Sequence, residues 1–143
     1  MASEAEATVV DFLANFHASE LDLPKIRAAL ADDARYQPIV PMSQPVIGAD
    51  AICAELERQY KIYADCECTI LNIASTATTV FTERVDRCRQ LADNRVTLVH
   101  VTGLFDVNAE GKIVWWREYW DALDIADQMG ISADVMKSVM ETA

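Results

Sequence analysis

The stretch Thr82-Glu83-Arg84-Val85-Asp86 places an arginine and an aspartate two residues apart inside a run that otherwise has the composition of a buried β-strand. Side chains alternate between the two faces of a strand, so Arg84 and Asp86 point to the same side. Val80 and Thr82, which share that side, are small and suit an interior face. Charged groups occupy such a face when they are paired or functional. The stretch therefore predicts a strand with a polar site on its inner face.

Four β-branched and aromatic runs with a period of two fill the second half of the chain. They are 67–74, 78–89, 95–107 and 112–120, separated by polar turns. The segment Asn108-Ala109-Glu110-Gly111 is typical of a hairpin connection. Because the three connections are short, the four strands are expected to form an antiparallel meander.

Apolar residues at helical spacing lie before and after these strands. Helices are expected over 3–18 with Ser3 as cap, from Leu23 with Asp32 and Asp33 at its exit, over 49–63, over 121–129, and from Ser132 onward. An extended piece at 34–37 leads into a loop with Pro38, Pro41 and Pro45, too rich in proline for a central strand. Helices followed by long antiparallel strands predict an α+β fold, a curved antiparallel sheet wrapped over N-terminal helices. A deep apolar pocket is expected between the sheet and the helices.

The bulk composition limits the partners. With 143 residues, 52% of them hydrophobic, the chain fits one domain over 1–143. The formal net charge of −11 argues against nucleic acid and against anionic membrane surfaces. No apolar run approaches the roughly 20 residues of a membrane span, and the first residues are acidic where a secretory signal would be basic. We expect a cytoplasmic protein with a small-molecule partner.

The four cysteines, Cys53, Cys66, Cys68 and Cys88, are expected to be reduced thiols that pack as small hydrophobic groups. Cys66 and Cys68 are too close in sequence for a Cys-x-x-Cys metal site, and both histidines are distant in sequence. No metal or other cofactor is expected.

A second charged group interrupts an aromatic strand near the end of the meander. Glu118 lies between Trp116 and Trp120 on one strand face. An acid flanked by indoles is expected to have a raised pKa. Two carboxylates and one arginine in an apolar pocket suit proton transfer, because one guanidinium cannot compensate both acids and the second holds a proton. The alternative is a buried salt-bridge cluster of Arg84, Asp86 and Glu118 that fixes strand register.

Several segments in order resemble the limonene epoxide hydrolase family, within the cystatin-like cone group that includes ketosteroid isomerases, polyketide cyclases and nuclear transport factor two. The resemblance extends over residues 5–129. It rests on the segment 32–37 followed by the proline-rich loop, on 82–86, on 103–105, and on 110–113 leading to 116–121. It implies the same cone fold, no cofactor and a homodimer that forms through the sheet.

The resemblance also implies roles for individual residues. Asp86 would be the acid that protonates an epoxide oxygen, Glu118 the base that activates water, Arg84 the bridge between them, and Tyr36 a holder of the water. Glu118 stands where the family has aspartate, and Pro38 stands where the family has a second water ligand, an asparagine. The pocket wall is expected to include Val80, Val99, Val101, Trp116 and Trp120.

Epoxide hydrolysis of a small apolar molecule is the leading prediction. An isomerase or cyclase similar to ketosteroid isomerase or the polyketide cyclases is the rival enzyme, favoured by Pro38, which offers neither a side-chain amide nor a backbone N–H. A non-catalytic small-molecule-binding domain is the third alternative.

Overall fold

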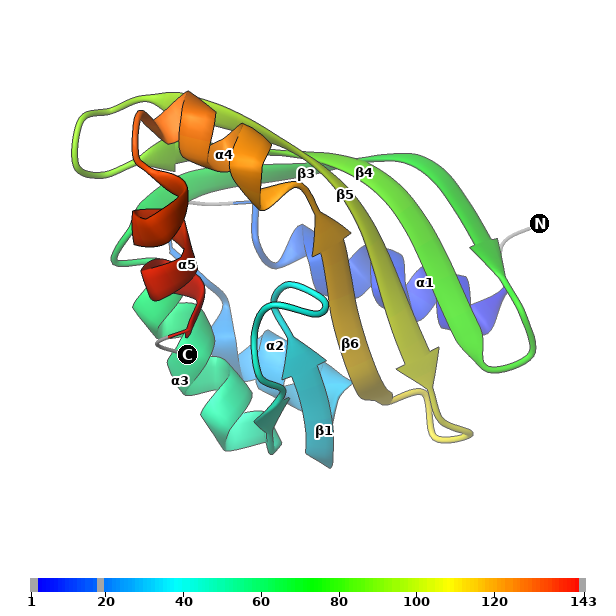
Figure 1. Ribbon diagram of the computed structural model, residues 1–143. Helices are drawn as coiled ribbons and strands as arrows, with labels where there is room; N and C mark the ends of the chain where they lie inside the picture. The colour runs from blue at the N-terminus through cyan, green and yellow to red at the C-terminus, as the bar shows by residue number, and fades with distance from the viewer. Residues whose placement is uncertain (1–2, 18–19, 142–143) are drawn as a thin grey trace.

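A six-stranded curved sheet organises the computed structural model, which describes residues 3–17 and 20–141 (Figure 1). The strands are β1 (Leu30–Gln37), β2 (Val46–Ile47), β3 (Tyr63–Ser75), β4 (Thr79–Gln90), β5 (Val96–Val107) and β6 (Ile113–Trp120). Their order across the sheet is β2-β1-β6-β5-β4-β3. Together with the helices this gives the α+β architecture that the sequence predicts.

The antiparallel meander is confirmed for β3 to β6, whose neighbours in the chain are also neighbours in the sheet. β1 joins this meander by pairing in parallel with β6, which the sequence does not reveal. Parallel pairing needs a long connection, here most of the chain, so no local pattern marks it. The prediction that Asp32 and Asp33 mark a helix exit is wrong. Both lie exposed within β1, where the register with β6 shifts between Leu30 and Arg35.

The helices are α1 (Glu4–Ala14), α2 (Leu23–Ala29), α3 (Ala49–Gln59), α4 (Ala122–Met129) and α5 (Ala133–Glu141). The Ser3 hydroxyl accepts a hydrogen bond of 3.0 Å from the backbone N–H of Glu6, which confirms the predicted cap. Helix α1 ends at Ala14, and the predicted end at residue 18 lies outside the described residues. Helix α3 ends four residues before the predicted 63, because Tyr63 already begins β3.

Helices α1, α2 and α3 lie on one side of the sheet, and α4 and α5 lie at the end where β6 finishes (Figure 1). The main core joins Val9 and Phe12 of α1 to Phe105 and Trp116 on the inner sheet face. A second cluster packs α4 against α5 and reaches the proline-rich loop through Ile39. The inner face of β4 to β6 therefore packs against α1 in the main core and against α4 and α5 in the second cluster.

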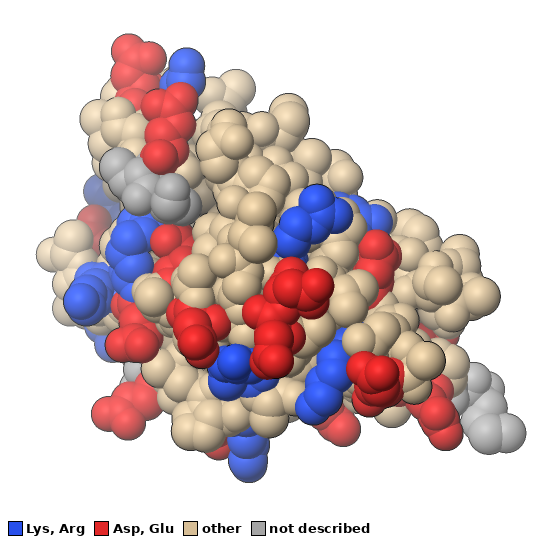
Figure 2. Space-filling model, turned by 90° about the horizontal axis from the view of Figure 1, so that it is seen from below, with Lys and Arg blue, Asp and Glu red and all other residues tan. Residues whose placement is uncertain are grey.

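Acidic and basic side chains are interspersed on the face seen from below in Figure 2, without a continuous basic area on that face. Within the described residues, no helix has the length and apolar character needed to cross a bilayer.

Candidate active site

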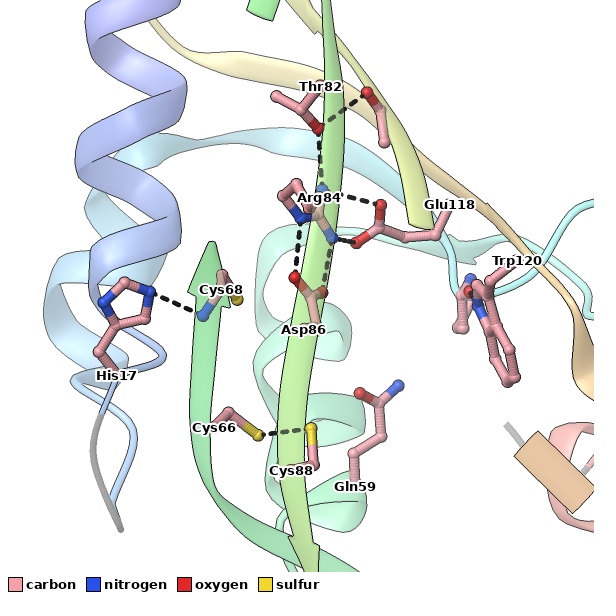
Figure 3. A network of polar contacts seen from close by, with 12 residues as sticks. His17, Gln59, Cys66, Cys68, Thr82, Arg84, Asp86, Cys88, Glu118 and Trp120 are labelled. Carbon is pink, nitrogen blue, oxygen red and sulfur yellow. Dashed lines mark hydrogen bonds and ion pairs between the residues drawn. The ribbon is translucent and has the colours of Figure 1, made fainter. Parts of the chain in front are cut away.

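The Arg84 side chain lies between two carboxylates on the inner face of the sheet (Figure 3). Its Nε and Nη2 donate to the two oxygens of Asp86 at 3.1 and 2.9 Å. Its Nη2 and Nη1 donate to the two oxygens of Glu118 at 2.8 and 3.3 Å. Only 1% of the Arg84 side chain is exposed, against 19% of Asp86 and 9% of Glu118. One guanidinium thus binds both acids through four of its five N–H groups.

Two small residues make room for this arrangement. Thr82 accepts a hydrogen bond of 3.0 Å from Nη1 of Arg84 and donates to the backbone carbonyl of Gly103 at 3.2 Å. Gly103 lies on β5, in register with Thr82 on one side and Glu118 on the other. A Cβ at residue 103 would collide with both the Arg84 guanidinium and the Glu118 carboxylate. Glycine at this position therefore lets β4 and β6 side chains meet across β5.

Burial and the ion pairs act against one another at this site. Burial raises the pKa of Glu118, and Arg84 opposes that rise through its charge and hydrogen bonds. Burial lowers the pKa of Arg84, but Glu118 and Asp86 outweigh it and hold that pKa well above its ordinary value. The indole N–H of Trp116 is buried and makes no hydrogen bond of standard geometry to any described residue. Its interaction with the Glu118 carboxylate nevertheless lowers the pKa of Glu118, as Arg84 does. Glu118 is therefore an acid with an upward-shifted pKa beside a permanent cation.

Tyr36 faces the carboxylates as part of a second polar group. Its hydroxyl accepts a hydrogen bond of 3.2 Å from Nε2 of Gln59, and Tyr63 donates to Oε1 of Gln59 at 2.8 Å. Gln59 Nε2 also donates to Glu55 at 3.3 Å, and Glu55 is held by two hydrogen bonds from Arg58. These contacts fix the orientation of the Gln59 amide, so that a donor meets the Tyr36 oxygen.

The Tyr36 proton is consequently free to act as a donor. No described residue accepts a hydrogen bond from the Tyr36 hydroxyl. Burial raises the pKa of Tyr36, with Glu118 the next contribution, so the phenol stays protonated at neutral pH. A protonated phenol with an occupied oxygen can direct its O–H toward a water or a substrate oxygen.

The proline-rich loop closes the site from the β6 side. The carbonyl of Pro38 accepts a hydrogen bond of 2.9 Å from the Trp120 indole, and the backbone N–H of Val40 donates to the Glu118 carbonyl at 2.9 Å. Pro38 therefore lines the larger cavity with its carbonyl already occupied, and it has no N–H of its own to offer.

Two adjoining cavities meet at the charged cluster. The larger one has a volume of about 160 Å³, and part of its wall consists of apolar side chains of β5, α4 and α5, among them Val99, Ile125 and Met136. The smaller one, of about 80 Å³, lies toward α1 and β3. Asp86, Glu118 and Tyr36 line both. Small apolar molecules would thus have the two carboxylates and the tyrosine at the inner end of their cavity.

The structure brings the four predicted catalytic candidates, Arg84, Asp86, Glu118 and Tyr36, to this one place. Of the predicted wall residues, Val99, Val101 and Trp120 line the larger cavity and Trp116 the smaller one. Val80 lies in the main core, and it lines neither cavity.

Sequence reasoning missed Gln59, Tyr63 and Gly103. Gln59 and Tyr63 lie on α3 and at the start of β3, so only the tertiary structure places them beside Tyr36. The signal for Gly103 was a glycine inside a strand pattern, which indicates a close approach to a neighbour. Within residues 3–17 and 20–141, no three or more His, Cys, Asp or Glu residues are grouped so that they could hold a metal ion.

Comparison with known proteins places this geometry in a family. The model of the limonene-1,2-epoxide hydrolase catalytic domain matches residues 3–130. An epoxide hydrolase of this type from M. tuberculosis is 27% identical, with a TM-score of 0.74 over 87% of this chain and 88% of that one.

Two more distant solved structures share the fold. The epoxide hydrolase/cyclase-like enzyme SalBIII has a role in pyran ring formation in the polyether salinomycin. It is 14% identical to this chain, with a TM-score of 0.75 over 85% of this chain and 93% of that one. A putative SnoaL-like polyketide cyclase from Shewanella putrefaciens is 9% identical with a TM-score of 0.78 over 90% and 87%. The fold is thus the α+β cone of the SnoaL-like proteins, and the chain belongs to the limonene-1,2-epoxide hydrolase catalytic domain family.

Proposed function

We propose that this protein hydrolyses an epoxide of a small apolar molecule to a diol by acid–base catalysis without a cofactor. The observation that carries the proposal is the binding of Arg84 to both Asp86 and Glu118 at the junction of the two cavities. One cation beside two acids favours a single shared proton, so an acid and a base coexist in the site.

The reaction needs one proton donor and one proton acceptor. Ionised Glu118 takes a proton from a water that the Tyr36 hydroxyl orients, and the water oxygen attacks an epoxide carbon. The carbon–oxygen bond of the ring breaks, and protonated Asp86 gives its proton to the leaving oxygen. Glu118 then carries the proton taken from the water and Asp86 is ionised, so transfer of that proton from Glu118 to Asp86 through water restores the site. Each positioned proton transfer contributes about 10²–10⁴-fold to the rate.

The division of roles is the one that the family resemblance implies. A raised pKa makes ionised Glu118 a stronger base, and the charge and hydrogen bonds of Arg84 favour its ionised form. Asp86 is the more exposed acid of the two and lines both cavities, so its proton can reach an epoxide oxygen that enters from the larger one.

The test is diol formation from a panel of small cyclic and terminal epoxides in water enriched in heavy oxygen. We expect one heavy oxygen per diol, and a rate loss of about 10²–10⁴-fold in both Asp86→Asn and Glu118→Gln. Asp106→Asn is the matched control, because Asp106 pairs with Arg117 outside both cavities. Wild-type rates in both site variants, or no diol from any epoxide, would refute hydrolysis.

A cyclisation or isomerisation by the same acid and base is the second candidate, and Pro38 is the observation that favours it. Pro38 offers no hydrogen-bond donor, and its carbonyl already accepts from Trp120. A nucleophilic water in the site would therefore have fewer protein partners to hold it. A hydroxyl or carbon acid of the substrate itself would then react. The Pro38→Asn variant separates the two reactions. It should form diol faster than the wild type if water is the native nucleophile, and it should form no diol if the protein is a cyclase or an isomerase.

The proposal includes a homodimer formed through the outer face of the sheet, in the cytoplasm. Phe81, Leu98 and Tyr119 are exposed apolar residues on that face, from three adjacent strands. Light scattering coupled to size exclusion is expected to give twice the chain mass, and Leu98→Glu is expected to give a monomer. Cell fractionation tests the location.

A further inference from the structure

Two cysteine sulfurs lie in contact at the wall of the catalytic cavities. The Sγ atoms of Cys66 and Cys88 are 3.1 Å apart (Figure 3). Cys66 lies on β3 and Cys88 on the neighbouring β4, and both side chains are buried. Both are free thiols in the structure.

An irregularity in β3 produces this contact. The register between β3 and β4 shifts between Ala64 and Glu67, and Asp65 has a φ of 55°. Such a bulge sets two residues of one strand against one of the other and re-aims a side chain. Asp65 is held there by an ion pair of 2.7 Å with Arg89. The local structure on both strands thus presents Cys66 to Cys88.

The two thiols are chemically different. The hydrogen bond between Cys66 and Cys88 lowers the pKa of the Cys66 thiol, with Tyr60 adding to the effect against the opposing effect of burial. The same hydrogen bond raises the pKa of Cys88, and burial is the second largest cause of that rise. Burial raises the pKa of Cys68, two residues further along β3. Cys66 is therefore the thiol of the three that forms a thiolate most readily, and the thiolate is the reactive form.

Small reagents can reach the pair through the cavities. Cys88 lines both of them, and Cys66 lines the smaller one, whose volume of about 80 Å³ holds molecules of the size of water. Cys88 also lies two residues after Asp86 on the same strand face, so the pair adjoins the proposed acid.

We propose that Cys66 and Cys88 are a peroxide-oxidised dithiol site, which forms a reversible disulfide in the wall of the catalytic cavity. The Cys66 thiolate attacks hydrogen peroxide, a sulfur–oxygen bond forms, the oxygen–oxygen bond breaks, and hydroxide leaves. The Cys88 sulfur then attacks the oxidised sulfur of Cys66. The sulfur–sulfur bond forms, the second oxygen leaves as hydroxide, and the proton of Cys88 converts one hydroxide to water. Two thiols lose two electrons in total, and one peroxide gains them.

The chain offers a direct way to map the product. Glu55, Glu67 and Glu83 separate the four cysteines in the sequence, so cleavage after glutamate puts each cysteine in its own peptide. After treatment with hydrogen peroxide and blocking of free thiols, we expect one crosslinked pair, 58–67 with 84–110. Dithiothreitol should restore both thiols, and non-reducing electrophoresis should show a monomer.

Variants and thermal unfolding provide independent readouts. Cys66→Ser and Cys88→Ser should each prevent the crosslink, whereas Cys68→Ser and Cys53→Ser should leave it intact. The oxidised wild type should melt on the order of 5–10 °C above the reduced protein, because the crosslink restricts the unfolded chain. Crosslinks to Cys53 or Cys68, disulfides between chains, or direct oxidation of Cys66 to a sulfinic acid without a crosslink would overturn the proposal. The mapping needs no substrate, so its outcome is independent of epoxide hydrolysis.

Discussion

Arg84 and Glu118 are joined by hydrogen bonds of 2.8 and 3.3 Å although their strands, β4 and β6, are separated in the sheet by β5. The two side chains meet above Gly103, where any Cβ would collide with both. The contact is thus made possible by an absent side chain on the intervening strand.

Replacing Gly103 by alanine should therefore displace the charged cluster. We expect Gly103→Ala to cost about 1–3 kcal/mol in the free energy of unfolding. The rate should fall by about 10²-fold, since catalysis tolerates little displacement. Urea unfolding and turnover measure the two effects. Gly111→Ala is the control: its φ of 75° strains alanine, but open space surrounds it, so it should lose stability without loss of turnover. Unchanged turnover in Gly103→Ala would contradict the proposed site.

Removing the cation should destabilise the fold more than removing any peripheral arginine. Arg84→Met leaves the buried Glu118 and the half-buried Asp86 without their partner, which should cost about 3–5 kcal/mol in the free energy of unfolding at pH 7. Arg117→Met, which breaks the more exposed pair with Asp106, should cost about 1 kcal/mol or less. Chemical denaturation compares them. Equal losses would mean that the Arg84 cluster contributes no more than a surface pair.

The pH dependence should reflect the raised pKa of Glu118. The proposed base works only when ionised, so the acid limb of kcat/KM should lie above the ordinary glutamate pKa of about 4.3. Between that value and the raised pKa, the folded chain binds more protons than the unfolded chain. The free energy of unfolding should therefore fall as pH rises through this window.

Two variants check the assignment of this pH dependence. Glu118→Gln should abolish the fall in stability, whereas Glu83→Gln, on the exposed side of β4, should retain it. If the acid limb of the kcat/KM profile lies at or below the ordinary glutamate pKa, the base is a group other than Glu118.

Gln59 should act as a positioning residue for Tyr36. Gln59→Leu removes the donor to the Tyr36 oxygen and should lower kcat by about tenfold with a smaller change in KM. Gln59→Glu should lower kcat further, because a carboxylate would accept the Tyr36 proton and turn it away from the cavity. Gln90→Leu is the control, since Gln90 lines the larger cavity but donates to Thr97. Equal kcat in the Gln59→Leu and Gln90→Leu variants would remove Gln59 from the mechanism.

Much of the fold could be predicted because it rests on local patterns. The period-two runs define β3 to β6 to within a few residues, and Ser3, Ser132 and Gly130 indicate helix ends that the structure confirms. The alternation of side chains also suffices to place Arg84 and Asp86 on one face, because both lie on a single strand.

The tertiary structure decided those relations between distant segments that no local pattern marks. The parallel pairing of β1 with β6 sets Tyr36 opposite Trp116, and α3 brings Gln59 to Tyr36 from 23 residues away. The bulge in β3 aims Cys66 at Cys88. Sequence periodicity reports only which face of its own element a residue occupies. The distance between two elements depends instead on how their buried faces pack together, and that packing is a property of the whole chain.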